Sequence, residues 1–545
     1  MTPRLTRRAV LAGTVLPLLG CQPAQSAMDG SFAGMAHERG HLLREPRVWP
    51  APAVTHRVSV LVAGGGVAGL AAARALRQRG VDDFALLELE DSAGGNSRGG
   101  SVQGIACPLG AHYLPLPGDS AREVQDLLEE LGLRRRVSGR WRYADEHLCH
   151  SPQERLFFNG QWQEGVLPLQ GVGANTLAQY RRFGQRVAAL QRAAAFSMPA
   201  LRTRFAPEHA ALDAVSFAHW LDTQGLDDPQ LRWYLDYCCR DDYGAGLTVV
   251  SAWAGVHYFA SRHGFHVPGE DGGGRDEAGR EASGDAVLTW PEGNGWLTRQ
   301  LAAPLGDRQR VAHTVVRIAE GRHGVEVDAF NHSAQTLERW EAQRCIVALP
   351  VFVAARVVQN PPGFLSALAA VQQHAAWLVA NVHLREPLFD RSGAAPSWDN
   401  VVYGTAGLGY VDATHQRLDP RPGPTVLSFY RALGGQPEAR RQLLAEPWTV
   451  WRDRIWAEHA LPHPDLPEKA TSMAITRYGH AMAIPTPGVW SQINALSTSG
   501  PFASTSGRLQ FAHSDWSGYS VFEEAFTRGH LAGSVTASVP QSHRP

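Results

Sequence analysis

Lysine is almost absent from this sequence, in which Lys469 is the only lysine among 51 lysine and arginine residues. The 52 acidic residues balance these cations, so that the formal net charge is -1 at pH 7. Proteins that bind nucleic acid through its phosphates carry a surplus of basic charge. The balance therefore argues against a nucleic-acid partner.

Cysteine is also scarce, with six residues and no Cys-x-x-Cys pair. The neighbours Cys238 and Cys239 could join in a disulfide only with strain. We expect buried free thiols rather than a disulfide framework. The cysteine spacing offers no zinc-type cluster either, and the sequence therefore predicts no metal centre.

No apolar run near the N-terminus is long enough to cross a membrane, because residues 9–19 (AVLAGTVLPLL) fall short of the ~20 residues required. The run follows Arg7-Arg8, which resembles a twin-arginine export motif, and precedes Cys21, which ends a sequence similar to a bacterial lipobox. We expect residues 1–27 to direct export to the periplasm or another extracytoplasmic space, with lipidated Cys21 as a membrane anchor. A signal cleaved near residue 27, with Cys21 discarded, is the alternative.

A strand, a glycine turn, a helix and a second strand follow one another from residue 58. Residues 58–63 (VSVLVA) are typical of a buried parallel strand, and Gly64, Gly66 and Gly69 follow as GxGxxG. These glycines permit a tight turn, close approach of a pyrophosphate and close packing of the helix, whose N-terminus favours phosphate. Glu88 ends the second strand, where a carboxylate can accept hydrogen bonds from ribose hydroxyls. The segment predicts a dinucleotide site.

A second glycine pair, Gly94-Gly95, follows Glu88 after five residues. This spacing resembles the E-x(5)-GG signature of the flavin-containing amine oxidase superfamily, which also holds polyamine oxidases and phytoene desaturases. Further segments resemble that family's motifs in order, at residues 110–113 (GAHY), 290–297 (WPEGNGWL), 311–318 (VAHTVVRI), 345–350 (CIVALP) and 511–529 (FAHSDWSGYSVFEEAFTRG). The resemblance spans roughly residues 56–535 and implies FAD as the cofactor. No cysteine lies in an obvious attachment motif near the C-terminal segment, so we expect the flavin to be bound without a covalent link.

The resemblance implies an α/β fold in which a Rossmann-like FAD-binding domain is interleaved with a mixed α+β substrate-binding domain. We expect a linker over residues 28–55, FAD-binding parts at 56–115, 286–350 and 476–540, and substrate-domain parts at 116–285 and 351–475. Residues 268–285 are rich in glycine and charge, which is typical of a surface insertion. A lid over the active site is the alternative.

The residues expected to bind the cofactor come from two arguments. The strand–turn–helix pattern predicts Gly64, Gly66, Gly69 and Glu88. The resemblance adds Gly95, Arg98, Gly110, Val315, Asp515 and Phe522. Arg98 departs from the family pattern, in which arginine directly follows the second glycine, because Asn96 stands there.

The family's active-site lysine lies a few residues before a Glu-Pro pair, which in this sequence is Glu386-Pro387. The corresponding position is Val379, and Lys469 is too distant along the chain to be an obvious replacement. This puts oxygen-dependent amine oxidation in doubt. A quinone or a haem protein could accept the electrons instead.

Several aromatic and polar residues are candidates for the reaction site. Tyr478 and Tyr519 are our choices for aromatics that face the flavin, Trp377 lies close to the position of the missing lysine, and His480 could act as a general base. Core packing is equally compatible with both tyrosines, and a structural role with His480. Aromatics and carboxylates at 398–400 (WDN), 410–416 (YVDATHQ) and 240–243 (RDDY) could hold a cationic amine, or could be an edge strand and a solvated helix end.

The sequence thus predicts an exported FAD-dependent oxidoreductase acting on the C–N bond of a small, polyamine-like amine. One alternative is a desaturase or isomerase acting on a C–C bond of an apolar substrate. Another is a flavin-binding protein without turnover. Aspartates in the substrate pocket would favour the amine, and a long apolar tunnel would favour the C–C chemistry.

Overall fold

The computed structural model describes residues 28–262, 264–267, 286–419, 421–436, 438–497 and 507–538. The expected targeting segment 1–27, with Cys21, and the glycine-rich stretch 268–285 lie outside these ranges. No helix in the described ranges has the length and apolar character to span a membrane.

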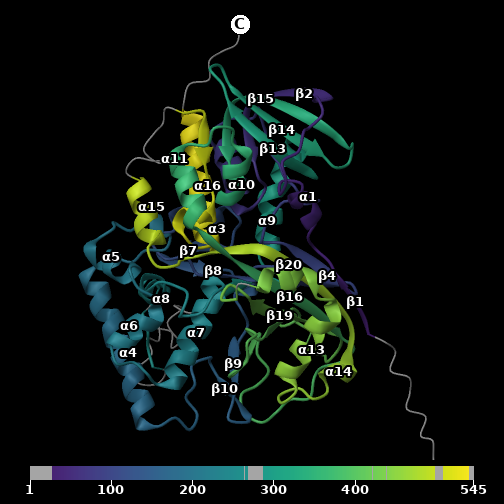
Figure 1. The fold of residues 1–545 in the computed structure, drawn as a ribbon. Helices are drawn as coiled ribbons and strands as arrows, with labels where there is room; N and C mark the ends of the chain where they lie inside the picture. The colour runs from purple at the N-terminus through teal and green to yellow at the C-terminus, as the bar shows by residue number, and fades with distance from the viewer. Residues whose placement is uncertain are drawn as a thin grey trace, which may run out of the picture.

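A seven-stranded sheet forms the upper half of the molecule in Figure 1. Its centre is parallel, with β2 (Val54–Ala63) between β3 (Phe84–Leu87) and β15 (Thr336–Val347). The C-terminal end of β2 is fully buried, as its β-branched run predicts. The remaining strands of this sheet are β12 (Gln309–Arg310), β13 (His313–Glu320), β14 (Val325–Asn331) and β21 (Leu509–Phe511).

Two helices pack against each other beside this sheet, α2 (Val67–Gln78) and α16 (Phe522–Ser538). Their backbones meet because α16 carries glycine where they cross. A Cβ atom on Gly529 would lie 2.0 Å from the carbonyl oxygen of Ala68, and one on Gly533 would lie 2.5 Å from that of Ala72. The last segment of the chain is thereby fixed to the first glycine turn.

An eight-stranded sheet forms the second half, in the order β1-β20-β16-β19-β18-β17-β9-β10. Helices α4 to α8 gather on one side of the view in Figure 1, and α13 and α14 on the other. The strands are β1 (Asp29–Phe32), β9 (Glu154–Phe158), β10 (Gln161–Glu164), β16 (Gln373–Leu384), β17 (Asp399–Val402), β18 (Tyr410–Asp412), β19 (Thr425–Ala432) and β20 (Ala470–Ile484). The helices are α4 (Ala174–Ala193), α5 (Pro207–Asp213), α6 (Phe217–Thr223), α7 (Pro229–Tyr243), α8 (Ala252–Ala260), α13 (Trp448–His459) and α14 (Leu466–Lys469).

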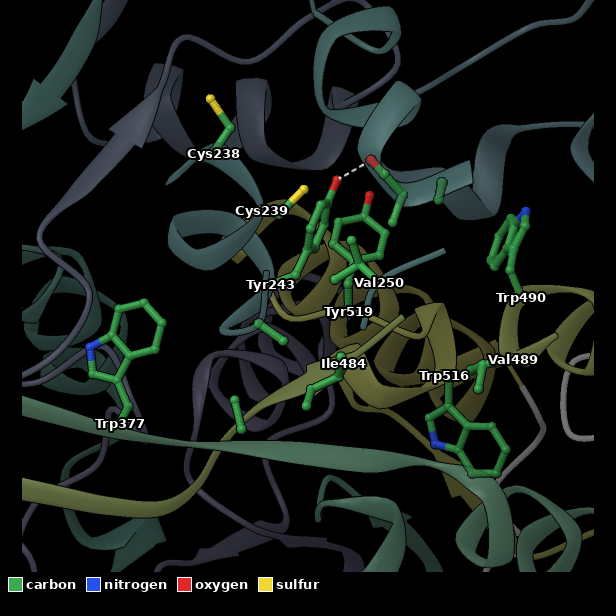
Figure 2. Close-up of a cluster of buried hydrophobic side chains, with 14 of the residues drawn as sticks. Cys238, Cys239, Tyr243, Val250, Trp377, Ile484, Val489, Trp490, Trp516 and Tyr519 are labelled. Carbon is green, nitrogen blue, oxygen red and sulfur yellow. Dashed lines mark hydrogen bonds between the residues drawn. The ribbon is translucent and has the colours of Figure 1, made fainter. Parts of the chain in front are cut away.

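The chain passes repeatedly between the two halves, which confirms the predicted mixed α/β fold. The expected domain limits stay predictions. The described cysteines are free, and Cys238 and Cys239 are buried on α7 (Figure 2).

Part of the segment expected as a linker, residues 28–55, packs against the rest of the fold. Its strand β1 pairs in parallel with β20, and the ring of Trp448 covers Gly30, where a Cβ atom would lie 2.3 Å from it. The short helix α1 (His37–His41) follows, and the amide of Ala36 donates to the carboxylate of Glu90. The segment is held mostly by backbone pairing at a sheet edge, which a four-residue sequence such as DGSF does not signal.

Candidate active site

The first glycine turn has the steric form that its sequence predicts. Gly64 has φ +104°, and a Cβ atom there would lie 2.3 Å from the carbonyl oxygen of Ala348. A Cβ atom on Gly69 would lie 1.9 Å from the carbonyl oxygen of Gly64. Gly66 is the N-cap of α2 and contributes no side chain. The first amides of a helix lack partners within it, so this turn presents donors to an anion.

The second glycine pair lies directly against the first turn. The amide of Gly94 donates to the carbonyl oxygen of Gly65 at 2.8 Å, and Gly66 and Gly94 form a parallel bridge. Gly95 has φ +58°, and its Cβ atom would come within 3.0 Å of the Cα atom of Gly66. The two turns form a backbone cradle without side chains, as close approach of a pyrophosphate requires.

Glu88 lies at the end of β3 and is buried. Its Oε2 accepts from the amide of Gly65 at 2.8 Å, and its Oε1 accepts from the amide of Glu90 at 2.9 Å. Burial raises the pKa of this carboxyl, and the two amide donors oppose that shift. Each oxygen keeps a lone pair for a ribose hydroxyl.

Arg98 makes contacts that the sequence did not predict. Its Nη1 donates to the carbonyl oxygen of Gly34 at 2.6 Å and lies 3.3 Å from Glu90. Asn96, at the position of the family's arginine, donates to the carbonyl oxygen of Ala481. The guanidinium of Arg98 thus ties the N-terminal segment to the cradle.

Asp515 is a buried carboxylate within the C-terminal motif. It accepts from the amide of Val351 at 2.8 Å and from Nε2 of His374 at 3.0 Å. Burial alone would raise its pKa, but the facing rings of His513 and His374 hold it well below the usual range. The residue is therefore an ionised acceptor fixed between the two halves.

The remaining expected cofactor residues fall in three settings. Gly110 fits tightly, because a Cβ atom there would lie 2.1 Å from the carbonyl oxygen of Asn96. Val315 is buried on β13, where the register with β14 shifts before Arg317. Phe522 stacks on Phe526 at 5.6 Å in the core between α16 and α2. Phe522 is thus a packing residue, because the helix starts at this position and buries the ring against α2.

One face of the eight-stranded sheet holds the segment that follows β5 (Ile105–Pro108). The hydroxyl of Tyr478 donates to the carbonyl oxygen of Leu109 at 2.8 Å, and that of Tyr430 donates to Gly110 at 3.1 Å. Trp377 is the cross-strand partner of Tyr478. Tyr478 therefore positions this segment through its hydroxyl group.

Tyr519 belongs to a different buried network. Its hydroxyl donates to Glu524 at 2.7 Å and lies 2.9 Å from Nε2 of His257. Figure 2 shows it beside Tyr243, with Trp377 well apart from both. His480 stacks on Phe352 at 4.4 Å. Within the described chain, the four expected catalytic residues therefore do not form one group: Trp377 and Tyr478 are paired, whereas Tyr519 and His480 have separate contacts.

His480 has a further property that bears on its expected role as a base. Burial of its ring and the nearby charges of Arg440 and His374 lower its pKa. The imidazole therefore remains neutral at neutral pH.

A group of acidic and aromatic side chains gathers next to residues 110–113. The hydroxyl of Tyr113 donates to Oδ2 of Asp241, on α7, at 3.2 Å. The ring of Trp398 lies 6.0 Å from Tyr113 and 5.4 Å from His112. Asp399 is the next residue, at the start of β17. Burial and the charges of Asp399 and Asp241 raise the pKa of Tyr237, on α7, well above its usual value. We call Asp241, Asp399, His112, Tyr113, Tyr237 and Trp398 the acidic–aromatic cluster.

The two aspartates of the cluster have raised pKa values, although the charges of Arg262 and Arg240 partly oppose the shift at Asp241. Burial and the charge of Asp242 raise the pKa of Asp241 to about 7, and burial and the charge of Glu154 raise that of Asp399 well above its usual value. The register of β17 and β9 places Asp399 opposite Glu154. Neither aspartate forms an ion pair with any residue of the described chain. A bound cation would relieve this concentration of negative charge.

Sequence reasoning found part of this cluster. It singled out 398–400 and 240–243 as candidates and left them open, but missed Tyr237 and the ring of His112. The signal in the sequence was an acidic residue close to an aromatic residue in each of these two segments. In contrast, no group of three or more histidine, cysteine or acidic side chains suited to a metal occurs within the described ranges.

The only lysine of the sequence has a structural role. Lys469 is buried, pairs with Asp465 at 2.9 Å and donates to the carbonyl oxygen of Pro387 at 2.6 Å. Val379, at the expected lysine position, is fully buried on β16 opposite Tyr430. The position faces the 108–110 segment, as the resemblance implies, but holds an aliphatic side chain.

The fit to a flavin dinucleotide can be judged from these residues. The glycine cradle would receive the pyrophosphate, Glu88 a ribose, and Asp515 the hydroxyl groups next to the ring system. Arg98 is turned away toward the N-terminal segment, and Phe522 is in the core. The donors and acceptors that remain still suit FAD.

Comparison with known proteins agrees with this fit. The family model described as flavin containing amine oxidoreductase matches residues 67–532. Amine oxidase [flavin-containing] B from Homo sapiens is 23% identical over 317 residues, covering 57% of this chain and 53% of that protein. The same enzyme from Bos taurus gives the same values over 316 residues. The chain spans about half the length of these curated relatives.

Solved structures share the fold at low identity. Putrescine oxidase bound to putrescine has a TM-score of 0.64 at 19% identity, covering 88% of this chain and 99% of that chain. Cyclohexylamine oxidase from Brevibacterium oxydans has 0.62 at 17% identity, covering 88% and 98%. A fatty acid isomerase from P. acnes has 0.56 at 15% identity, covering 87% and 97%. With the family model spanning most of its length, this chain belongs to the flavin-containing amine oxidoreductases, whose cofactor is FAD.

Proposed function

We propose that this protein oxidises the C–N bond of an amine, held as a cation by the acidic–aromatic cluster. The observation that carries the proposal is the pair Asp241 and Asp399, half-buried beside Tyr113 and Trp398, without an ion-pair partner in the described chain. When bound, FAD supplies the acceptor for a hydride from the carbon next to nitrogen. The protein supplies the orientation of the amine.

Each part of the cluster has a role toward an ammonium group. The carboxylates offer charge, and the rings of Tyr113 and Trp398 offer faces for cation–π contact. Two carboxylates from different elements, α7 and β17, suit a substrate with two cationic nitrogens. This favours a diamine or polyamine over a monoamine.

An amine must lose its ammonium proton before its C–N bond can be oxidised. Asp241 has a pKa of about 7, so its carboxylate can take up a proton at Oδ1 or Oδ2 near neutral pH. Tyr113 holds that carboxylate in place through its hydroxyl group.

The electron acceptor follows from the residue at position 379. With valine there and Lys469 held by Asp465, no lysine is available at the flavin face. We propose a quinone or a haem protein as the acceptor, in place of oxygen.

The proposed location rests on the sequence of residues 1–27. The twin-arginine motif suits a protein exported after folding around its cofactor. We propose an extracytoplasmic enzyme anchored through lipidated Cys21, close to membrane-bound acceptors.

The test is anaerobic reduction of the flavin, measured by absorbance in protein expressed without residues 1–27. The panel contains a diamine, a triamine, a monoamine, an amino acid and an unsaturated fatty acid. Rapid bleaching by the di- and triamines supports the proposal, and comparison of oxygen with a quinone then identifies the acceptor. If no amine reduces a flavin that dithionite does reduce, the proposal fails, and turnover of the fatty acid would establish C–C chemistry.

A further inference from the structure

A two-stranded hairpin concentrates positive charge in a chain whose net charge is -1. Strands β7 (Arg134–Val137) and β8 (Arg140–Tyr143) pair antiparallel and carry five arginines in ten residues. Ser138 and Gly139 connect them, both at positive φ, +49° and +80°. Two such residues give the turn that matches the twist of a hairpin.

The register divides the hairpin into two faces. Arg134 and Arg136 share one face with their cross-strand partners Tyr143 and Trp141. On this face Arg134 is neutralised and packed, because it pairs with Glu129 at 3.0 Å and lies 3.8 Å from the ring centre of Trp141. Successive side chains of a strand alternate between faces, so Arg135 and Arg142 lie on the other face.

Arg135 and Arg142 are directly opposite each other in the register. Like charges in that position destabilise a sheet. Neither arginine has an acidic partner among the residues that the structure describes, whereas Arg134 does. Val137 is next to them on the same face and is 43% exposed. The fold thus keeps an uncompensated pair of arginines beside an exposed apolar side chain.

We propose that this face, with Arg135, Val137 and Arg142, docks on the surface of an anionic phospholipid bilayer. Phosphate groups of the lipids would neutralise Arg135 and Arg142, and the 43% exposed side chain of Val137 would meet the interfacial region. A bilayer offers phosphates at every position and needs no complementary shape. A stable protein partner would need about 1,200 Å² or more of matched surface, which a ten-residue hairpin does not provide alone.

The experiment uses the full FAD-loaded chain with Cys21→Ser, so that no acyl chain contributes. Sedimentation is measured with vesicles of phosphatidylcholine alone and with vesicles containing phosphatidylglycerol. We expect preferential binding to the anionic vesicles that weakens with salt. Arg135→Gln/Arg142→Gln should lower that affinity roughly 30-fold, from about 1 kcal/mol for each basic residue at such a surface.

The matched control is Arg186→Gln/Arg192→Gln, which removes the same charge from exposed positions of α4. If this control lowers binding as much as the hairpin variant, or if both vesicle types bind equally, the proposal is wrong. The proposal is also wrong if the hairpin variant still binds the vesicles but no longer binds an acidic protein partner. Because Arg135→Gln/Arg142→Gln removes a repulsive pair, its thermal midpoint should not fall, which separates lost docking from lost folding.

Discussion

The hydroxyl group of Tyr113 donates a hydrogen bond to Asp241 across 128 residues of sequence. Tyr113 begins β6 (Tyr113–Pro115), directly after the segment that the sheet holds at Leu109 and Gly110. Asp241 is near the C-terminus of α7. This contact joins the part of the chain expected to pass the flavin to the helix that brings negative charge.

Removal of either cluster aspartate should weaken amine binding without loss of flavin. For Asp241→Asn or Asp399→Asn, we expect the amine concentration for half-maximal flavin reduction to rise about 10- to 100-fold, the range of a hydrogen bond to a charged group. Asp307→Asn, at an exposed position, serves as the control. An unchanged concentration dependence in both cluster variants would place the substrate elsewhere.

The raised pKa of Asp241 predicts a pH dependence with a defined sign. Its pKa is about 7 in the fold and 3.8 when unperturbed, so the unfolded chain loses this proton first. The free protein should therefore lose stability as pH rises from about 4 to about 7. A cationic amine binds the ionised form, so its stabilising effect should grow over the same range.

The measurement is the shift in thermal midpoint caused by a saturating diamine at pH 5.5 and pH 8. We expect the larger shift at pH 8 and a flatter response in Asp241→Asn. Equal shifts in the wild-type protein at both pH values would contradict the role of this carboxyl group.

Substitution in the second glycine turn should reduce cofactor retention. Gly95 and Gly132 both have positive φ, +58° and +73°, but only a Cβ atom on Gly95 would meet another atom, the Cα of Gly66 at 3.0 Å. Both alanine variants should lose about 1–2 kcal/mol of stability from the strained backbone. Only Gly95→Ala should also lose flavin, measured by the ratio of flavin to protein absorbance. If Gly95→Ala and Gly132→Ala retain equal amounts of flavin, the glycine cradle is not part of the cofactor site.

Lys469 should be essential to stability and irrelevant to flavin chemistry. Lys469→Met leaves Asp465 buried without its charge partner, which costs about 3–5 kcal/mol for a buried pair. Arg385→Met, which breaks the exposed pair with Glu468, should cost less than about 1 kcal/mol. Denaturant unfolding measures both. A slower reduction of the flavin in folded Lys469→Met would show that the lysine does reach the chemistry.

The cofactor half was the more predictable part of this protein. The geometry of GxGxxG, Glu88 and the second glycine pair could be predicted from their spacing, because these residues act directly on neighbouring backbone. Arg98 and Phe522 were less predictable. The contacts of Arg98 depend on Gly34 in a strand-and-helix segment that looked like a linker, and the ring of Phe522 is fixed by a helix from the other end of the chain.

The sequence by itself determined the family, the cofactor and the fold class, because these rest on short motifs whose residues act on one another locally. Only the tertiary structure decided which of the scattered acidic residues meet. Asp241 and Asp399 come from a helix and a strand 158 positions apart in the numbering of the chain, and each alone is compatible with a solvated helix end or an edge strand. Their placement beside Tyr113 and Trp398, and the pairing of Lys469 with Asp465, follow from long-range packing that no local pattern encodes.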